Sequence, residues 1–102
     1  MSEYLTVWRI KVDDSNVERL VRDQPKAVAF TKSISPELLS AELIKLEDGR
    51  WLHMLRWSSQ DGLAKLGERL AENPEEAAEA GALHPYVAED EAIGHGEVVT
   101  HA

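Results

Sequence analysis

The sequence predicts an α+β domain whose elements run strand, helix, strand, strand, helix, strand. Three observations predict this order. Residues 4–12 place Tyr, Thr, Trp, Ile and Val on one face and Leu, Val, Arg and Lys on the other, with the period of two that is typical of a strand. Asp48-Gly49 is a hairpin turn sequence. Two segments, near Ser15 and near Ser58, have polar helix-start residues followed by apolar residues at helical spacing. The length fits one domain over residues 1–102.

The first helix is expected directly after the first strand. Ser15-Asn16-Val17-Glu18 is a capping box, in which the serine and glutamate side chains satisfy free amides at a helix start. Pro25 then limits the helix, because a proline in a helix interior costs about 3 kcal/mol. We therefore expect this helix to end or kink near Asp23, and residues 26–34 to form a second short helical piece.

Local propensity and topology disagree over residues 38–46. Ser35-Pro36-Glu37 is a good helix start, and the leucines that follow it fit a helical stripe. The Asp48-Gly49 turn favours a strand instead, because strand-like residues 51–57 follow it directly and a hairpin needs a strand on each side. We assign a strand to residues 38–46.

The rest of the chain predicts a second helix, a short helical piece and a last strand. Residues 58–61 cap the second helix, whose leucines recur at helical spacing. Asn73-Pro74 restarts the helix with proline at its first position. After His84-Pro85 we expect an acidic loop, and residues 93–101 form the last strand.

This order, with right-handed crossovers, gives a four-stranded antiparallel sheet with both helices on one face, which is the ferredoxin-like βαββαβ arrangement. A sheet face that is open to water should be polar. The third strand is instead apolar on both faces, with one face formed by Trp51, Leu55 and Trp57 and the other by Leu52 and Met54. We therefore expect a second copy of the chain to cover the open face in a homodimer, and a different partner protein is the alternative.

The net charge of −8 is unevenly distributed. Residues 1–69 contain all eleven Lys and Arg, whereas eight of the nineteen acidic residues lie from Leu70 onward. An acidic surface repels phosphates, so nucleic acid and anionic membranes are not expected as partners. No run approaches the ~18 apolar residues of a membrane span, and the first residues lack the basic start of a signal peptide. The sequence contains no cysteine, and we expect a cytoplasmic protein.

Residues 48–59, Asp-Gly-Arg-Trp-Leu-His-Met-Leu-Arg-Trp-Ser-Ser, and the helix after them resemble the dimeric α/β barrel superfamily, particularly the antibiotic biosynthesis monooxygenase (ABM) family. In that family, too, a hairpin strand ends in Trp plus a small polar residue and leads into the second helix. The resemblance implies an ABM-like dimeric α/β barrel over residues 1–102. Members include cofactor-independent oxygenases of aromatic polyketides, haem-degrading enzymes and proteins with no established activity.

The resemblance implies a small monooxygenase that oxidises an aromatic or polyketide-like molecule, without a cofactor, in a pocket between helices and sheet. One alternative is a non-catalytic dimer that binds a small hydrophobic ligand or another protein. The other is a haem-binding or haem-degrading protein. That branch combines a first-strand asparagine, a tryptophan in the second helix and a later histidine, whereas this chain offers Trp8, Leu66 and His84. Two of the three residues are missing, so this alternative is the weaker one.

A cofactor-free oxygenase needs an apolar pocket for a flat substrate and a base that helps to form its anion, which then reduces oxygen. We expect His84 to be the base, since imidazole transfers protons near neutral pH. His53 shares a strand face with two tryptophans and could reach the ligand. The candidate walls are the aromatic side chains Trp8, Phe30, Trp51, Trp57 and Tyr86. Each residue also has a plainer interpretation: a loop histidine before a proline for His84, a hydrogen-bonded core group for His53, and packed sheet residues for the tryptophans.

No metal site or cofactor is predicted. His95, Glu97 and His101 share one face of the expected last strand, but six residues of strand separate the two histidines by about 20 Å, which is too far for one ion. The sequence has no phosphate loop, dinucleotide fingerprint or serine elbow.

Overall fold

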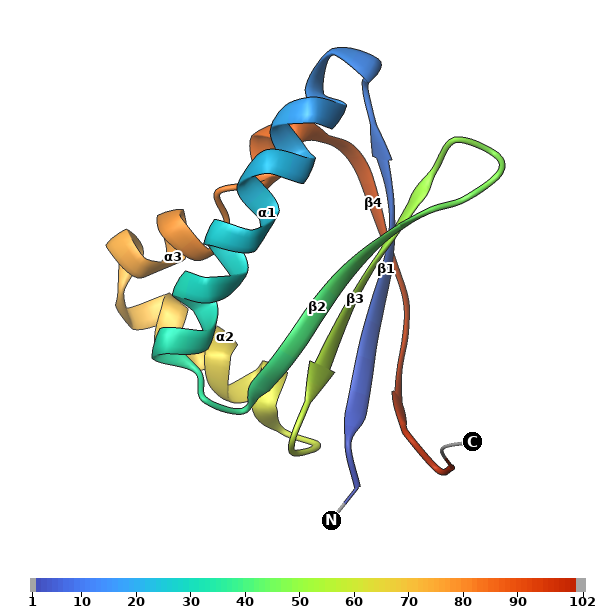
Figure 1. Ribbon diagram of the computed structural model, residues 1–102. Coiled ribbons are helices and arrows are strands. Elements are labelled where there is room, and N and C mark those ends of the chain that lie inside the picture. The colour runs from blue at the N-terminus through green and yellow to red at the C-terminus, as the bar shows by residue number, and fades with distance from the viewer. Residues whose placement is uncertain (1, 101–102) are drawn as a thin grey trace.

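The computed structural model describes residues 2–100 and shows a four-stranded sheet with all its helices on one face (Figure 1). The elements are β1 (Tyr4–Val12), α1 (Asp14–Ile34), β2 (Leu38–Lys45), β3 (Trp51–Trp57), α2 (Gly62–Glu72), α3 (Pro74–Ala80), a 3-10 turn η1 (His84–Tyr86) and β4 (Val87–Glu97). The strands are ordered β2-β3-β1-β4, and every neighbouring pair is antiparallel. The predicted ferredoxin-like arrangement is confirmed.

The assignment of a strand before the hairpin is also confirmed. β2 pairs with β3 along its length, and Leu38 at its start is only 2% exposed. In the turn, Gly49 has a φ of +87°, and the Asp48 carboxylate accepts a hydrogen bond from the Arg50 amide at 2.9 Å. Pairing with β3 and burial of Leu38 therefore outweigh the helical propensity of this segment.

The first helix differs from the prediction at its start, which was placed from the capping box, and at Pro25, which was expected to end or kink it. α1 begins after Asp13 rather than at Ser15, and it runs through Pro25 to Ile34 without a break. Its buried residues Leu20, Ala27 and Thr31 lie on both sides of the proline. They form one stripe against the sheet, so tertiary packing outweighs the cost of a missing amide at Pro25.

The last strand begins earlier than predicted. β4 runs from Val87 to Glu97, and the stretch that was expected to be an acidic loop forms its first half. Its register pairs Val12 with Val87 and Ile10 with Asp90, with irregularities that let the acidic strand follow β1. The prediction failed because β4 is an edge strand with almost no buried residues, so its sequence lacks an apolar alternation.

The helix-facing side of the sheet carries two buried clusters at opposite ends of β3. One surrounds Trp57 and includes Leu38 and Leu66. The other surrounds Trp51 and includes Ile10, Val12, Leu20, Ala27 and Leu83. His53 and Leu55 lie between the two ends on the same face of β3.

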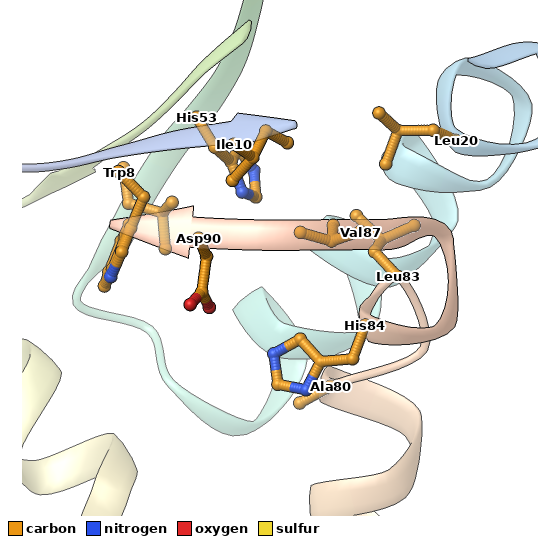
Figure 2. A pocket seen from close by; sticks show the side chains of 10 residues that line it. Trp8, Ile10, Leu20, His53, Ala80, Leu83, His84, Val87 and Asp90 are labelled. Atoms are coloured by element: carbon orange, nitrogen blue, oxygen red, sulfur yellow. The ribbon is translucent and has the colours of Figure 1, made fainter. Parts of the chain in front are cut away.

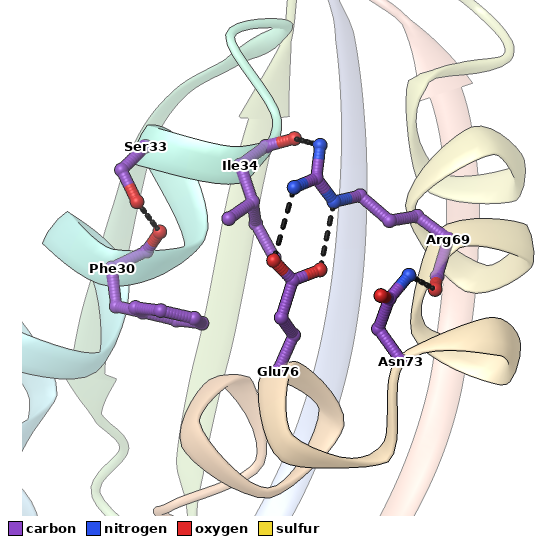
Figure 3. A network of polar contacts seen from close by, with 6 residues as sticks. All are labelled: Phe30, Ser33, Ile34, Arg69, Asn73 and Glu76. Carbon is purple, nitrogen blue, oxygen red and sulfur yellow. Dashed lines mark hydrogen bonds and ion pairs between the residues drawn. The ribbon is translucent and has the colours of Figure 1, made fainter.

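A polar network fixes the short α3 against the other helices (Figure 3). The Arg69 guanidinium of α2 donates two hydrogen bonds to the Glu76 carboxylate of α3, at 2.8 and 3.0 Å, and a third to the Ile34 carbonyl at 3.2 Å. Asn73 donates to the Arg69 carbonyl at 2.7 Å. One guanidinium therefore joins the ends of three helices and holds α3 over the sheet.

No described element covers the other face of the sheet (Figure 1). Half-buried and exposed apolar side chains lie there, namely Leu5, Val7, Ile44, Leu52 and Met54. Charged pairs lie among them, and they join Arg9 to Glu91, Arg56 to Glu3 and Arg50 to Glu89. Within residues 2–100, no helix is both long and apolar enough to cross a membrane.

Candidate functional site

A cavity of about 260 Å³ lies between the sheet and the helices, beside the middle of β3 (Figure 2). Its walls are mostly apolar, and its polar groups are the side chains of His53, His84 and Asp90 and the indole of Trp8. The apolar lining consists of Ile10, Leu20, Leu55, Ala80, Leu83 and Val87. An apolar hollow with a few convergent polar groups is the usual form of a small-molecule site.

His53 is the deepest polar group of this cavity. Its strand pairs it with Trp8 on one side and Leu43 on the other, so the imidazole stands between two apolar neighbours. Its Nε2 atom is buried and has no hydrogen-bond partner among the described residues. Burial lowers the pKa of His53 below its usual value. The ring is therefore neutral at pH 7 and retains an unused polar atom.

His84 stands at the mouth of the cavity and is exposed. It begins the turn η1, where its amide donates to the Gly81 carbonyl at 3.0 Å. A side chain at Gly81 would lie 3.3 Å from the His84 Nδ1, so the glycine leaves room for the ring. Two residues later, the Tyr86 hydroxyl donates to Asp23 of α1 at 2.7 Å and ties the turn to the long helix.

The carboxylate that Tyr86 contacts also belongs to an ion pair on α1. The Arg22 guanidinium donates to the same Asp23 carboxylate, and together with Tyr86 it lowers the pKa of Asp23 to about 2. The hydrogen bond to Asp23 also raises the pKa of Tyr86. Tyr86 therefore remains a protonated donor at neutral pH and holds the turn that carries His84.

A second hollow of about 310 Å³ adjoins the first and shares His53, Leu83 and His84 with it. It continues toward α2, where Leu66 and Leu70 form its wall, and it passes under the small residues Ala77 and Gly81. Ala80 of α3 lines both hollows. Together they reach the size that ligand sites commonly have.

Trp8 and Asp90 complete the mouth opposite His84. Trp8 lies on the helix-facing side of β1, and Asp90 pairs with Ile10 from the neighbouring edge strand. Figure 2 shows the Asp90 carboxylate and the His84 imidazole pointing into the same space, beside the Trp8 indole. Sequence reasoning missed Asp90, because the acidic run around it was interpreted as a loop.

The structure brings only some of the candidate residues together. Trp8, His53 and His84 line one cavity, as their proposed roles require. Trp57 is fully buried, and its indole Nε1 donates to the Thr6 hydroxyl at 2.9 Å, so it has no cavity to line. Phe30 and Tyr86 line a separate hollow between α1 and the segment of α3 and η1.

His95 and Glu97 of the last strand both contact Tyr4 of the neighbouring strand β1. Glu97 accepts a hydrogen bond from the Tyr4 hydroxyl at 3.3 Å, and the Tyr4 and His95 rings meet edge to face at 5.9 Å. His101 lies outside the described residues. Among residues 2–100, no three His, Asp or Glu side chains are grouped so that they could hold a metal ion.

Solved structures with the same fold match nearly the whole chain. SnoaB from Streptomyces nogalater, a cofactor-independent oxygenase, has a TM-score of 0.65 and 18% sequence identity, over 100% of this chain and 96% of that chain. A protein from Caulobacter crescentus CB15, provisionally assigned as an antibiotic biosynthesis monooxygenase, has a TM-score of 0.70 and 20% identity, over 97% and 92%. A mutant of MhuD, solved with two manganese protoporphyrin IX molecules bound per active site, has a TM-score of 0.70 and 22% identity, over 97% of both chains.

No protein-family model matches the sequence, and no curated protein matches it. At these low identities the similar structures show the fold. The chain has the ferredoxin-like fold that these solved structures share, and the fold that the resemblance of residues 48–59 implied is confirmed.

Proposed function

We propose that the chain is a small monooxygenase that oxidises an aromatic molecule without a cofactor, in the cavity between Trp8, His53 and His84. The observation that carries this proposal is the pairing of two imidazoles at different depths of one apolar cavity. One imidazole is buried with an unused nitrogen, and the other is exposed at the mouth. The similarity to SnoaB, which is itself a cofactor-independent oxygenase, agrees with this chemistry.

The two histidines have different tasks in this mechanism. Burial lowers the pKa of His53, so the neutral ring hydrogen-bonds to the substrate and fixes its orientation. His84 removes a proton from an acidic carbon beside a carbonyl group of the substrate. Because His84 is exposed, it can pass that proton to water and be ready for the next cycle.

Molecular oxygen is the oxidant. The substrate carbanion gives one electron to O₂, and the resulting radical pair combines to form a carbon–oxygen bond. The peroxide anion takes up a proton and then loses water, so that a CH₂ group and O₂ become a C=O group and H₂O. The protein supplies the base, the orientation and an apolar environment that keeps bulk water from quenching the carbanion.

Haem fits this cavity poorly. Its two propionate groups need cations or several hydrogen-bond donors, but no Lys or Arg lines either hollow, and the Asp90 carboxylate stands at the mouth. His84, which the family resemblance matches to the iron-ligating histidine of the haem-degrading branch, lines the cavity. A titration with hemin tests this point, and we expect no Soret shift.

The oxygenase proposal is tested with anthrone, a flat tricyclic probe with an acidic CH₂ group beside its aromatic ketone. We expect oxygen uptake and formation of anthraquinone by the metal-free protein. His84→Ala should lower the rate about 10²- to 10⁴-fold, the usual contribution of a general base. His95→Ala is the matched control. His95 lies on the helix-facing side of the sheet, as the cavity does, but its ring contacts Tyr4 instead.

Two results would count against the oxygenase proposal. Oxygen uptake no faster than in buffer, combined with tight binding of anthrone, would indicate a non-catalytic binding module. An equal rate in the His84→Ala variant and the wild-type protein would remove His84 from the mechanism.

We also propose that two copies of the chain pair through the open sheet face. Its apolar residues include Ile44, which is 37% exposed, and monomers rarely leave a continuous apolar sheet face uncovered. The Arg9–Glu91 and Arg56–Glu3 pairs give this face charges of both signs. A two-fold axis can therefore place opposite charges against each other around an apolar centre.

Light scattering at micromolar concentration tests the dimer. We expect about twice the chain mass of 11.4 kDa. Met54→Lys should shift the mass toward that of the monomer, and the fold should tolerate it because Glu42 is the cross-strand neighbour of Met54. Val21→Lys is the control, since Val21 is 51% exposed on the helix side. A wild-type mass near 11.4 kDa would overturn the dimer.

A further inference from the structure

Three consecutive acidic residues of β4 separate onto opposite faces of the sheet. Glu89 and Glu91 point to the open face, where they pair with Arg50 and Arg9. Asp90 between them points to the cavity, in register with the buried Ile10. It has no hydrogen bond or ion pair with any other residue in the part of the chain that the structure describes.

The cavity contains nothing that would neutralise this carboxylate. The lining of both hollows includes no Lys or Arg, and its other polar groups are the two imidazoles, the Trp8 indole and the Thr31 hydroxyl. His53 is held neutral by its burial. The mouth therefore has a negative charge beside an aromatic ring, which is a combination that binds organic cations.

We propose that Asp90 selects the charge of the ligand, so that the cavity takes an aromatic molecule bearing a protonated amine and rejects carboxylates. The inference rests on the proposed ligand cavity and adds a substrate class to it. The aromatic body lies against the apolar walls, and the ammonium group lies between the Asp90 carboxylate and the Trp8 ring. An anionic ligand meets the same carboxylate with no compensating cation.

Three probes with one aromatic body test the inference: 1-naphthylmethylamine, 1-naphthalenemethanol and 1-naphthoate. Binding is measured from the shifts of assigned backbone and Trp8 indole resonances in two-dimensional NMR at pH 7. We expect the amine to bind about tenfold more tightly than the carboxylate, with the alcohol between them, which is a modest effect because Asp90 is exposed. In Asp90→Asn the difference should fall to about twofold.

Glu89→Gln is the matched control. It removes the same unit of charge one residue away, but Glu89 lies on the open face beside Arg50 at 3.8 Å. A general preference of this acidic protein for cations would fall equally in both variants, and that result would overturn the role of Asp90. Probes that bind without any charge preference would also overturn it, while leaving the cavity as a ligand site. If no probe shifts the Trp8, His53 or His84 signals, the ligand cavity itself is refuted.

Discussion

The C-terminal end and the middle of β3 carry two rings with polar atoms on the same face, Trp57 and His53, but their surroundings differ. At the C-terminal end, Trp57 is fully buried and its indole N–H is hydrogen-bonded to Thr6. In the middle of the strand, the Nε2 atom of His53 is buried without a partner, next to a cavity. The hydrogen bond of the Trp57 ring is satisfied within the core, whereas the buried His53 nitrogen lacks a partner, which in our proposal the ligand supplies.

The helices above the sheet cause this difference. α2 begins at Gly62, where even a Cβ atom would lie 2.8 Å from the Trp57 ring, so helix and ring are in close contact. α3 brings only small side chains toward His53, such as Ala77 and Ala80. The C-terminal end of β3 is therefore closed by direct contact with α2, whereas the middle of the strand borders a cavity.

Truncation of Trp57 and of Trp8 should show the largest contrast. We expect Trp57→Ala to lower the free energy of unfolding by about 3–5 kcal/mol, the usual cost of removing a packed aromatic ring. Trp8→Ala should cost clearly less, because Trp8 is half-buried and already borders a cavity. Urea unfolding of both variants measures the difference, and equal losses would contradict it.

The contact at the start of α2 should give the next largest effect. Gly62→Ala forces a methyl group against Trp57, and we expect a loss of about 1–3 kcal/mol from overpacking. Gly67→Ala lies in the same helix with nothing within 4 Å of its Cβ position, so it should gain about 1 kcal/mol from helix propensity. Thermal unfolding distinguishes the two variants, and a stable Gly62→Ala protein would contradict the close packing.

Replacement of His53 should stabilise the fold and weaken binding. In His53→Leu the buried nitrogen without a partner is gone, so we expect a gain of about 1 kcal/mol at pH 7. The same variant should bind the naphthyl probes less tightly, as is common where stability is sacrificed for a site. A loss of stability at unchanged affinity would mean that His53 is an ordinary core residue.

The pH dependence of stability should give the smallest effect. The folded-state pKa of His53 is lowered, so below its unfolded pKa, near 6.5, the unfolded chain binds more protons than the folded one. The free energy of unfolding should therefore fall as pH decreases from 7 to 5.5. Over this pH range we expect the free energy of unfolding to fall less in His53→Leu than in the wild-type protein. The difference between the two proteins should be below about 1 kcal/mol. Parallel profiles would contradict the lowered pKa.

The sequence predicted much of the fold and three of the ten residues that line the first cavity, namely Trp8, His53 and His84. The hairpin turn at Asp48-Gly49 located two strands, and the alternation of residues 4–12 placed Trp8 on the same face as Ile10. Phe30 and Tyr86 were assigned to the same pocket as Trp8, yet they line a separate hollow between α1 and the segment of α3 and η1. Residue type alone could not separate them, because an aromatic ring suits a core, a surface groove and a ligand wall equally well.

Some features were determined by sequence alone, because they depend on neighbouring residues. These are the strand period, the turn at Gly49 and the helix start at Pro74. Only the tertiary structure decided that α1 continues through Pro25 and that the acidic run of β4 is a strand. It also decided that Trp57 is satisfied while His53 is not. Each of these depends on contacts between segments far apart in the chain, whose packing and hydrogen bonds outweigh local propensity.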